Sequence, residues 1–292
     1  MGLIIKVRIT GGLGNQLFKF ANGLRVSDYF KSDLVLDISW YSHNYMKSNF
    51  VSNREFELNY FPEITNFKQY VTKFPEIDKV RGKLERRLSP KIQERIGLMT
   101  EGNVDFFIKR PNVIDGSFER ISFLANIEAL EHCLKFPKQT SRWFDESLLH
   151  DSNKFAIAVH VRRTDYLNLG HIYDVVGKNY YLNSIQLLRQ ANQKIELHLF
   201  SDDPDGALRW FGKDLKFEKI INPPVGTPSG EVLRLMSTYK SIIAANSTFS
   251  WWAAFLGRMK NKELQVVLPK QFSNLPNDDP EKYLKIEGSV FL

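Results

Sequence analysis

Short apolar segments alternate with amphipathic helical segments along this chain, in two successive series. Residues 3–9 are rich in β-branched side chains, and a glycine turn separates them from Leu17, Phe20, Ala21 and Leu24, which recur at i, i+3, i+4 and i+7. A short apolar segment over 34–38 completes a strand–helix–strand unit. This order predicts a parallel sheet covered by helices.

The second series follows the polar stretch 150–154. It predicts a strand over 155–161, a helix over 179–191 and a strand over 195–200, after which strands and helices continue to alternate. We therefore expect an α/β protein with two Rossmann-like domains, residues 1–150 and 151–292, that face each other across a cleft. Helices are also predicted over 77–97 and over 119–134.

Composition narrows the classes of partner. The 292 residues carry a formal net charge of +7, which favours a nucleotide, a nucleic acid or an anionic membrane surface. The single cysteine, Cys133, excludes an internal disulfide framework and lies at helical spacing from Leu130 and Leu134, as expected for a core thiol. The sequence shows no convincing signal peptide or membrane span, and we expect a cytoplasmic protein.

One segment concentrates positive charge. Residues 79–95 contain seven basic and two acidic side chains. The pattern is typical of a solvated helix face, and it also fits contact with anionic lipid or an acidic acceptor.

The glycine turn of the first series resembles a dinucleotide-binding loop. Gly12 and Gly14 match the first two glycines of that pattern, Leu17 replaces the third, and Asp37 follows near the position of a ribose-binding acid. Asn15 and Gln16 add amide groups at the helix start. The loop is either a tight structural turn or a ligand contact.

Two arginines follow the first strand of the second series. A buried strand ends at His160, Arg162, Arg163 and Asp165. In open α/β sheets, ligands bind where such strands end. Guanidinium groups keep their charge and pair with phosphate oxygens in a forked geometry. We expect Arg162 to face the ligand and Arg163 to brace the loop or Asp165, while His160 is either a core histidine or a nucleotide contact.

Two further segments end strands of the same series. Asp202 and Asp203 precede Pro204, which is compatible with helix capping, with a contact to a purine or ribose, or with a metal site that lacks a third ligand. In the last segment, Ser247, Thr248 and Ser250 offer hydroxyl groups just ahead of an apolar helix, and Phe249 lies among them. With the arginines, these groups predict a clamp for a diphosphate.

The chain resembles the bacterial α-1,2-fucosyltransferases and their superfamily, which includes α-1,6- and protein O-fucosyltransferases. The resemblance rests on residues 11–18, 160–165, 199–204 and 246–254. It implies a GT-B-like fold, GDP-fucose as the donor, no metal requirement, inversion at the anomeric carbon and transfer to the 2-hydroxyl of a galactose.

Individual roles follow from the same resemblance. It implies that Arg162 binds the β-phosphate, His160 the nucleotide, Asp203 the guanine or ribose, and Ser250 with its neighbours the phosphates. The α-1,6 relatives have a glutamate shortly after the arginine pair, and residues 166–170 contain no acid here. Asp165 is the nearest carboxylate for a general base, although pairing with arginine would make it a weak one.

Three alternatives remain open at this point. They are an NAD-dependent oxidoreductase that uses the Gly12–Gly14 loop, a nucleic-acid-binding module, and a sugar- or nucleotide-binding protein without catalysis. For the enzyme, we expect the first domain, with Gly12, Asn15 and Gln16, to border the donor or acceptor. The acceptor would be a galactose-containing glycan, such as a lipid-linked one at the inner face of the membrane.

Overall fold

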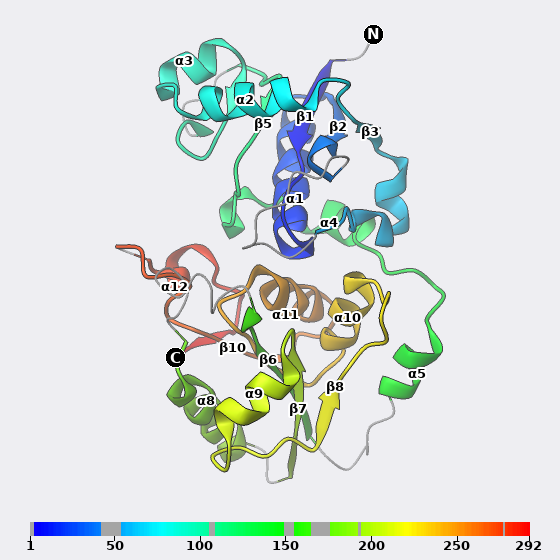
Figure 1. Ribbon diagram of the computed structural model, residues 1–292, viewed down its shortest axis with the longest axis vertical. Coiled ribbons are helices and arrows are strands. Elements are labelled where there is room, and N and C mark those ends of the chain that lie inside the picture. Colours follow the sequence, from blue (N-terminus) through cyan, green and yellow to red (C-terminus); the bar gives the residue numbers. More distant parts are fainter. Residues whose placement is uncertain are drawn as a thin grey trace. The chain divides into compact units, whose positions relative to one another are not determined.

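We describe the protein from a computed structural model, for residues 3–41, 54–104, 109–148, 155–164, 176–191, 194–276 and 278–292. Asp165 lies outside the described residues. The chain divides into two compact units (Figure 1). The first unit ends at Pro137, and the second contains Lys138–Leu292. Both units are α/β, so the expected fold class is confirmed at the level of each unit.

The first unit is built on a parallel sheet. Its described strands are β1 (Ile4–Arg8), β2 (Asp33–Asp37), β3 (Lys68–Tyr70), β4 (Leu98–Met99) and β5 (Val113–Ile114). Their order is β3-β2-β1-β5-β4, and every pair is parallel.

Helix α1 (Leu13–Tyr29) packs on β1 and β2 with an almost wholly buried surface. Gly23 allows close approach, since a Cβ there would lie 3.1 Å from Val7. The predicted first strand–helix–strand unit is therefore confirmed.

Two predicted helices of this unit are wrong in extent. The segment 77–97 forms α2 (Pro75–Arg86) and α3 (Pro90–Arg95), and the break falls before Pro90, whose ring is tolerated only in the first turn of a helix. The segment 119–134 begins as the 3₁₀ turn η5 (Ile121–Phe123). Its α-helix, α4 (Ile127–Cys133), starts only where Asn126 caps the Ala129 N–H, and it buries Cys133. Further 3₁₀ turns among the described residues are η1 (Ser39–Tyr41), η2 (Leu58–Tyr60) and η3 (Pro62–Asn66).

The second unit contains a larger parallel sheet. Its described strands are β6 (Phe155–Val161), β7 (Ile195–Ser201), β8 (Lys219–Ile221), β9 (Ser241–Ile243), β10 (Gln265–Leu268) and β11 (Val290–Phe291). The strand order is β11-β10-β9-β6-β7-β8. Its described helices are α5 (Arg142–Leu148), α8 (Lys178–Ala191), α9 (Pro204–Phe211), α10 (Ser229–Met236), α11 (Thr248–Lys260) and α12 (Pro280–Tyr283).

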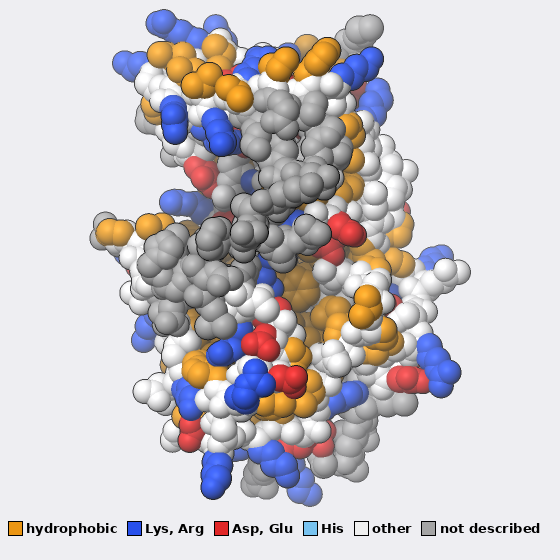
Figure 2. All heavy atoms as spheres, in the orientation of Figure 1, with side chains coloured by type: hydrophobic (Ala, Val, Ile, Leu, Met, Phe, Trp, Pro, Cys, Tyr) orange, Lys and Arg blue, Asp and Glu red, His pale blue; other side chains and the backbone are white. Residues whose placement is uncertain are grey.

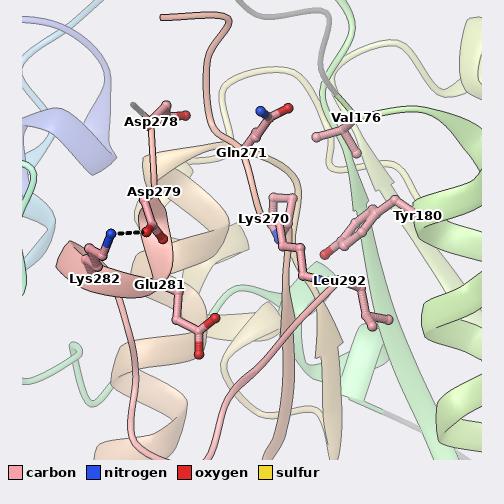
Figure 3. Close-up of a pocket in the computed structure, with 10 residues that line it drawn as sticks. Val176, Tyr180, Lys270, Gln271, Asp278, Asp279, Glu281, Lys282 and Leu292 are labelled. Atoms are coloured by element: carbon pink, nitrogen blue, oxygen red, sulfur yellow. Dashed lines mark ion pairs between the residues drawn. The ribbon is translucent and has the colours of Figure 1, made fainter. Parts of the chain in front are cut away.

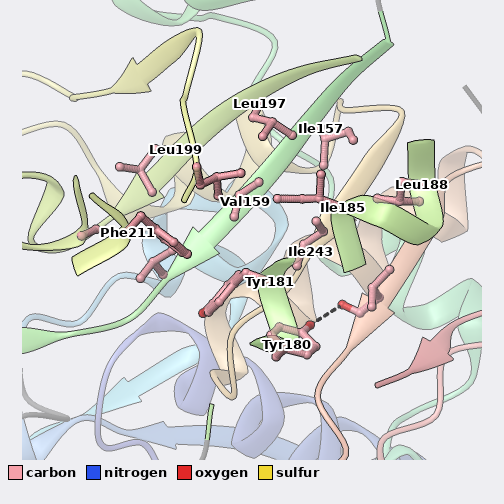
Figure 4. Packing of buried hydrophobic residues seen from close by; sticks show 14 residues of the cluster. Ile157, Val159, Tyr180, Tyr181, Ile185, Leu188, Leu197, Leu199, Phe211 and Ile243 are labelled. Carbon is pink, nitrogen blue, oxygen red and sulfur yellow. Dashed lines mark hydrogen bonds between the residues drawn. The ribbon is translucent and has the colours of Figure 1, made fainter. Parts of the chain in front are cut away.

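Alternate residues of β6 and β7 face opposite sides of this sheet. Ile157, Val159 and Val161 face α8 and α9, and they pack with Tyr181 and Phe211 in a closed apolar cluster (Figure 4). His160 lies on the other face, where its ring meets Phe249 of α11. The sheet therefore carries His160 to the side of the sheet where α11 packs.

The boundary between the units lies earlier than the expected residue 150. Helix α5 belongs to the second unit, because it packs on α10 and because the Ser141 N–H donates to the buried Glu231 carboxylate at 2.9 Å. Among the described residues, no helix is long and apolar enough to span a bilayer.

Candidate functional site

One carboxylate organises the ends of β6 and β7. Asp202, directly after β7, accepts the Arg163 N–H at 2.9 Å and the Thr164 N–H at 3.2 Å, and the Thr164 hydroxyl also donates to it. Arg162 Nη1 lies 3.1 Å from the same carboxylate. Asp202 therefore holds the segment that follows β6 in place, because three consecutive residues of that segment donate to its carboxylate.

The second arginine is held by the neighbouring acid. Arg163 Nε lies 3.6 Å from Asp203 Oδ2, and its guanidinium stands 5.4 Å from the centroid of the Trp210 ring on α9. Both contacts direct Arg163 toward α9, which agrees with a bracing role. Two arginines and two aspartates leave the cluster formally neutral, so a bound anion would rely on directed donors more than on net charge.

Asp203 is also a helix cap. Its Oδ1 accepts the Gly206 N–H at 2.9 Å at the start of α9. A Cβ on Gly206 would lie 1.8 Å from Asp203 Oδ2, so only glycine leaves room for this carboxylate. The structure thus shows the capping role that the sequence left open, while a nucleotide contact of Asp203 stays a prediction.

His160 is buried and neutral near pH 7. Burial lowers the pKa of His160 to about 4, and the charge of Arg162 acts in the same direction against that of Asp202. Its carbonyl accepts the Tyr181 hydroxyl at 3.1 Å, and its ring centroid lies 5.8 Å from that of Phe249. Within the described residues, His160 Nδ1 is buried without a hydrogen-bond partner. An unsatisfied buried polar atom is costly, and a ligand that bonds to it would relieve this cost.

The predicted hydroxyl segment forms the start of α11. Ser247 is its N-cap and accepts the Phe249 N–H at 3.4 Å. Ser250 is fully buried, and its hydroxyl donates to the backbone carbonyls of Ala245 and Ser247. Thr248 opens the helix, whose N-terminal N–H groups and dipole favour an anion.

The glycine loop lies in the other unit. Gly11 has a φ of 85°, and its carbonyl accepts the Tyr41 hydroxyl. Gln16 is fully buried: its amide donates to the carbonyls of Gly11 and Glu55 and accepts the Glu57 N–H at 2.9 Å. The Gln16 side chain therefore holds the loop in place.

Gly12 caps α1, and a Cβ there would lie 3.3 Å from Arg54 Nη1. Arg54, which the sequence did not single out, thus lies against the loop. Ligand contacts of Gly12, Asn15 and Gln16 stay predictions.

The second unit thus brings together six of the predicted site residues. These are His160, Arg162, Arg163, Asp202, Asp203 and Phe249. The sequence missed Thr164, Gly206 and Trp210, which complete the cluster. Gly206, three residues after Asp203, carried the one available signal, because a cap at that position bonds to the third residue of the helix.

A second titratable cluster in the first unit was also missed. Burial raises the pKa of Glu119 to about 7, with Glu101 acting in the same direction and Lys19 opposing. Burial lowers the pKa of Lys19, whose ammonium donates to the Gly116 carbonyl. Gly116 and Glu119 follow β5, Glu101 follows β4, and Lys19 reaches them from α1.

A pocket of about 640 Å³ opens in the second unit beyond the ends of β10 and β11 (Figure 3). Val176 and Tyr180 line it on one side, and Lys270, Gln271 and Lys282 line it on others. Its described lining contains none of the predicted site residues, because β10 is separated from β6 by β9. The polar cluster, and not this pocket, coincides with the predicted motifs. Among the described residues, no group of three His, Cys, Asp or Glu side chains is arranged to hold a metal ion.

Known proteins are similar to this chain in sequence and in fold. An α-1,2-colitosyltransferase of Escherichia coli is 26% identical over 97% of this chain and 99% of its own length. The O-antigen biosynthesis glycosyltransferase WbnK of Escherichia coli is 27% identical over 90% of this chain and 93% of its own. A galactoside 2-alpha-L-fucosyltransferase of Caenorhabditis elegans is 22% identical over 61% of this chain and 50% of its own.

The crystal structure of fucosyltransferase NodZ from Bradyrhizobium matches with a TM-score of 0.50 and 17% identity, over 88% of this chain and 94% of that one. This likeness supports the GT-B-like fold class. The model of glycosyl transferase family 11 matches residues 138–285, which include β6 to β10 and the whole polar cluster. The chain therefore belongs to glycosyl transferase family 11.

Proposed function

We propose that this glycosyltransferase moves fucose from GDP-fucose to the 2-hydroxyl of a galactose in a glycan, with inversion and without a metal ion. One observation carries the proposal. At the carboxyl edge of the sheet, Asp202 pairs with Arg162 and accepts hydrogen bonds from the Arg163 and Thr164 N–H groups. It holds a forked, permanently charged donor at the position where open α/β sheets bind ligands. The family assignment favours this activity over the NAD-dependent oxidoreductase and over a binding protein without catalysis.

Each part of the cluster has a role in binding the donor. Arg162 binds the β-phosphate, and the start of α11, with Ser247, Thr248 and Ser250, offers N–H groups to the same diphosphate. His160 bonds to the nucleotide through its unsatisfied Nδ1. Asp203 contacts the guanine or ribose, and Asp202 and Arg163 keep the arginine loop in position.

The reaction exchanges one C–O bond for another. The acceptor hydroxyl attacks the anomeric carbon of fucose, and the bond from that carbon to the β-phosphate oxygen breaks, so the electron pair leaves with GDP. Negative charge grows on the departing phosphate, and Arg162 stabilises it by directed hydrogen bonds, an effect on the order of 10²- to 10³-fold in rate. The hydroxyl proton passes to a base, for which Asp165 is the predicted candidate, or to water.

Colitose is the second candidate for the transferred sugar. The Escherichia coli relative that matches nearly the whole chain is named a colitosyltransferase, whereas the Caenorhabditis elegans relative is named for fucosyl transfer to a galactoside. A galactose-containing glycan, lipid-linked in the cytoplasm, is the proposed acceptor in both cases. The donor sugar therefore needs a direct test.

The test is a transfer assay with chelator present. GDP-fucose and the nucleotide-activated form of colitose are compared as donors, and a galactoside is compared with its 2-deoxy analogue as the acceptor. The proposal expects preference for GDP-fucose, no product with the 2-deoxy acceptor and an inverted linkage by NMR. Faster transfer from activated colitose would reassign the donor, and product from the 2-deoxy acceptor would refute the linkage.

A further inference from the structure

Large apolar side chains are exposed along α2 and α3 and just before them. Phe74, Ile77 and Leu84 keep 64%, 65% and 58% of their surface exposed. Other exposed apolar side chains of the same segment are Val71, Val80, Leu88, Ile92 and Ile96. Figure 2 shows hydrophobic and basic side chains together over α2 and α3, at the top left of the view. Single exposed hydrophobic residues are ordinary, but a contiguous group marks a contact surface.

Helix α2 turns its polar side toward the rest of the first unit and its apolar side outward, which is the reverse of a normal surface helix. Its inner side is polar: Glu85 lies 3.1 Å from Arg8, and Arg86 lies 2.8 Å from Asp115, which also pairs with Arg8 at 2.9 Å. Gly82 lets the Arg8 guanidinium approach the helix. Ordinary surface helices turn their apolar stripe to the core.

The apolar stripe of α2 therefore points outward. Ile77, Val80 and Leu84 recur at i, i+3 and i+7, which places them on one face, away from Gly82 and Arg86. The ion pairs on the inner side hold the helix in this orientation. The exposed apolar surface is thus a built feature of the unit.

Basic side chains surround this apolar stripe. Lys83, Arg87, Lys91 and Arg95 are exposed, and the Arg81 side chain is 69% exposed even though it pairs with Glu85. The segment 79–95 carries seven basic against two acidic residues. A second copy of the chain would bring like charges together at this surface, and a nucleic acid would leave the apolar stripe in water.

We propose that the α2–α3 surface, defined as the exposed apolar and basic side chains of residues 71–96, docks on an anionic lipid bilayer. The apolar stripe enters the boundary between headgroups and acyl chains, while the surrounding lysines and arginines meet the lipid phosphates. This combination of an apolar face with flanking cations is what an anionic interface requires. The surface would hold the first unit against a membrane that carries lipid-linked acceptors.

The test is flotation of the full-length protein with vesicles. One set contains phosphatidylcholine alone, and the other an equal mixture of phosphatidylcholine and phosphatidylglycerol. The wild type binds the anionic set and not the neutral set. The double variant Ile77→Ser with Leu84→Ser binds at least roughly tenfold more weakly. The double variant Arg87→Gln with Lys91→Gln binds roughly 25-fold more weakly, because each cation near the surface contributes about fivefold.

Matched controls separate this surface from general hydrophobicity and charge. Val225→Ser with Leu275→Ser removes apolar side chains of the second unit that are at least as exposed, and Lys213→Gln with Lys216→Gln removes exposed cations there. Both controls bind like the wild type, and all variants keep the wild-type unfolding temperature. Vesicle binding needs no nucleotide, so the result is independent of the transferase proposal.

Three results would overturn the proposal. The first is failure of the wild type to float with anionic vesicles. The second is wild-type binding by either α2–α3 variant. The third is a wild-type dimer that Ile77→Ser with Leu84→Ser converts to a monomer, which would assign the surface to a second copy of the chain.

Discussion

Replacing Gly206 with alanine should destabilise α9, although alanine is the better helix former. Inside a helix the exchange normally gains about 1 kcal/mol. Here the new Cβ would lie 1.8 Å from Asp203 Oδ2 and 2.5 Å from Asp203 Cγ, so the carboxylate must leave its position.

The cost follows from what that carboxylate does. It caps the Gly206 N–H at 2.9 Å, and loss of such a cap costs about 1 kcal/mol. It also lies 3.6 Å from Arg163, a partly exposed ion pair worth up to about 1 kcal/mol. About 2 kcal/mol lost against about 1 gained gives a net destabilisation of about 1 kcal/mol.

A double-mutant cycle isolates the cause. In an Asp203→Ala background the cap is already absent, so Gly206→Ala should stabilise by about 1 kcal/mol, a coupling of about 2 kcal/mol between the two sites. Urea unfolding followed by tryptophan fluorescence measures each corner of the cycle. Gly177→Ala is the control, because an added Cβ there has no atom within 4 Å. Equal stabilisation by Gly206→Ala in both backgrounds would refute the reasoning.

Two further predictions concern the first unit. Because the folded-state pKa of Glu119 is raised to about 7, the wild type gains stability below the usual pKa of a glutamate and loses it as pH rises through about 7. Thermal unfolding from about pH 5 to about pH 8 should show a decline on the order of 2 kcal/mol that Glu119→Gln lacks, and parallel profiles would contradict the assignment. Gln16→Leu should cost about 2–4 kcal/mol, since it removes the Gln16 bonds to the Glu55 carbonyl and the Glu57 N–H and leaves the Gly11 carbonyl with the Tyr41 hydroxyl; a loss no larger than that of the exposed-site variant Gln69→Leu would show that Gln16 does not hold the loop.

Sequence patterns predicted the strands and long helices well where periodicity and burial agree. The strand 155–161 is confirmed as β6, and the predicted helix 179–191 coincides with most of α8. Errors came where local chemistry interrupts a periodic pattern. Pro90 divides the basic helix, and Asn126 delays the start of α4.

The candidate site was predictable in position but not in its internal connections. Strand ends placed His160, Arg162 and Asp202 at one edge, because carboxyl ends of parallel strands meet there. The pairing of Arg162 with Asp202 and of Arg163 with Asp203 depends on the register between β6 and β7, which a single sequence does not determine. The raised pKa of Glu119 depends likewise on burial and on the charge of Glu101, which the sequence pattern does not place beside it.

Donor recognition by the arginine cluster is tested most directly by calorimetric titration of GDP, GDP-fucose, UDP-sugars and NAD into the full-length protein, with chelator present throughout. We expect GDP and GDP-fucose to bind, and Arg162→Ala to weaken both by about 10²-fold while Arg209→Ala, an exposed arginine on α9, has no effect. If no guanine nucleotide binds while NAD or a UDP-sugar does, the result would contradict the account. Unchanged GDP affinity in Arg162→Ala would contradict it equally.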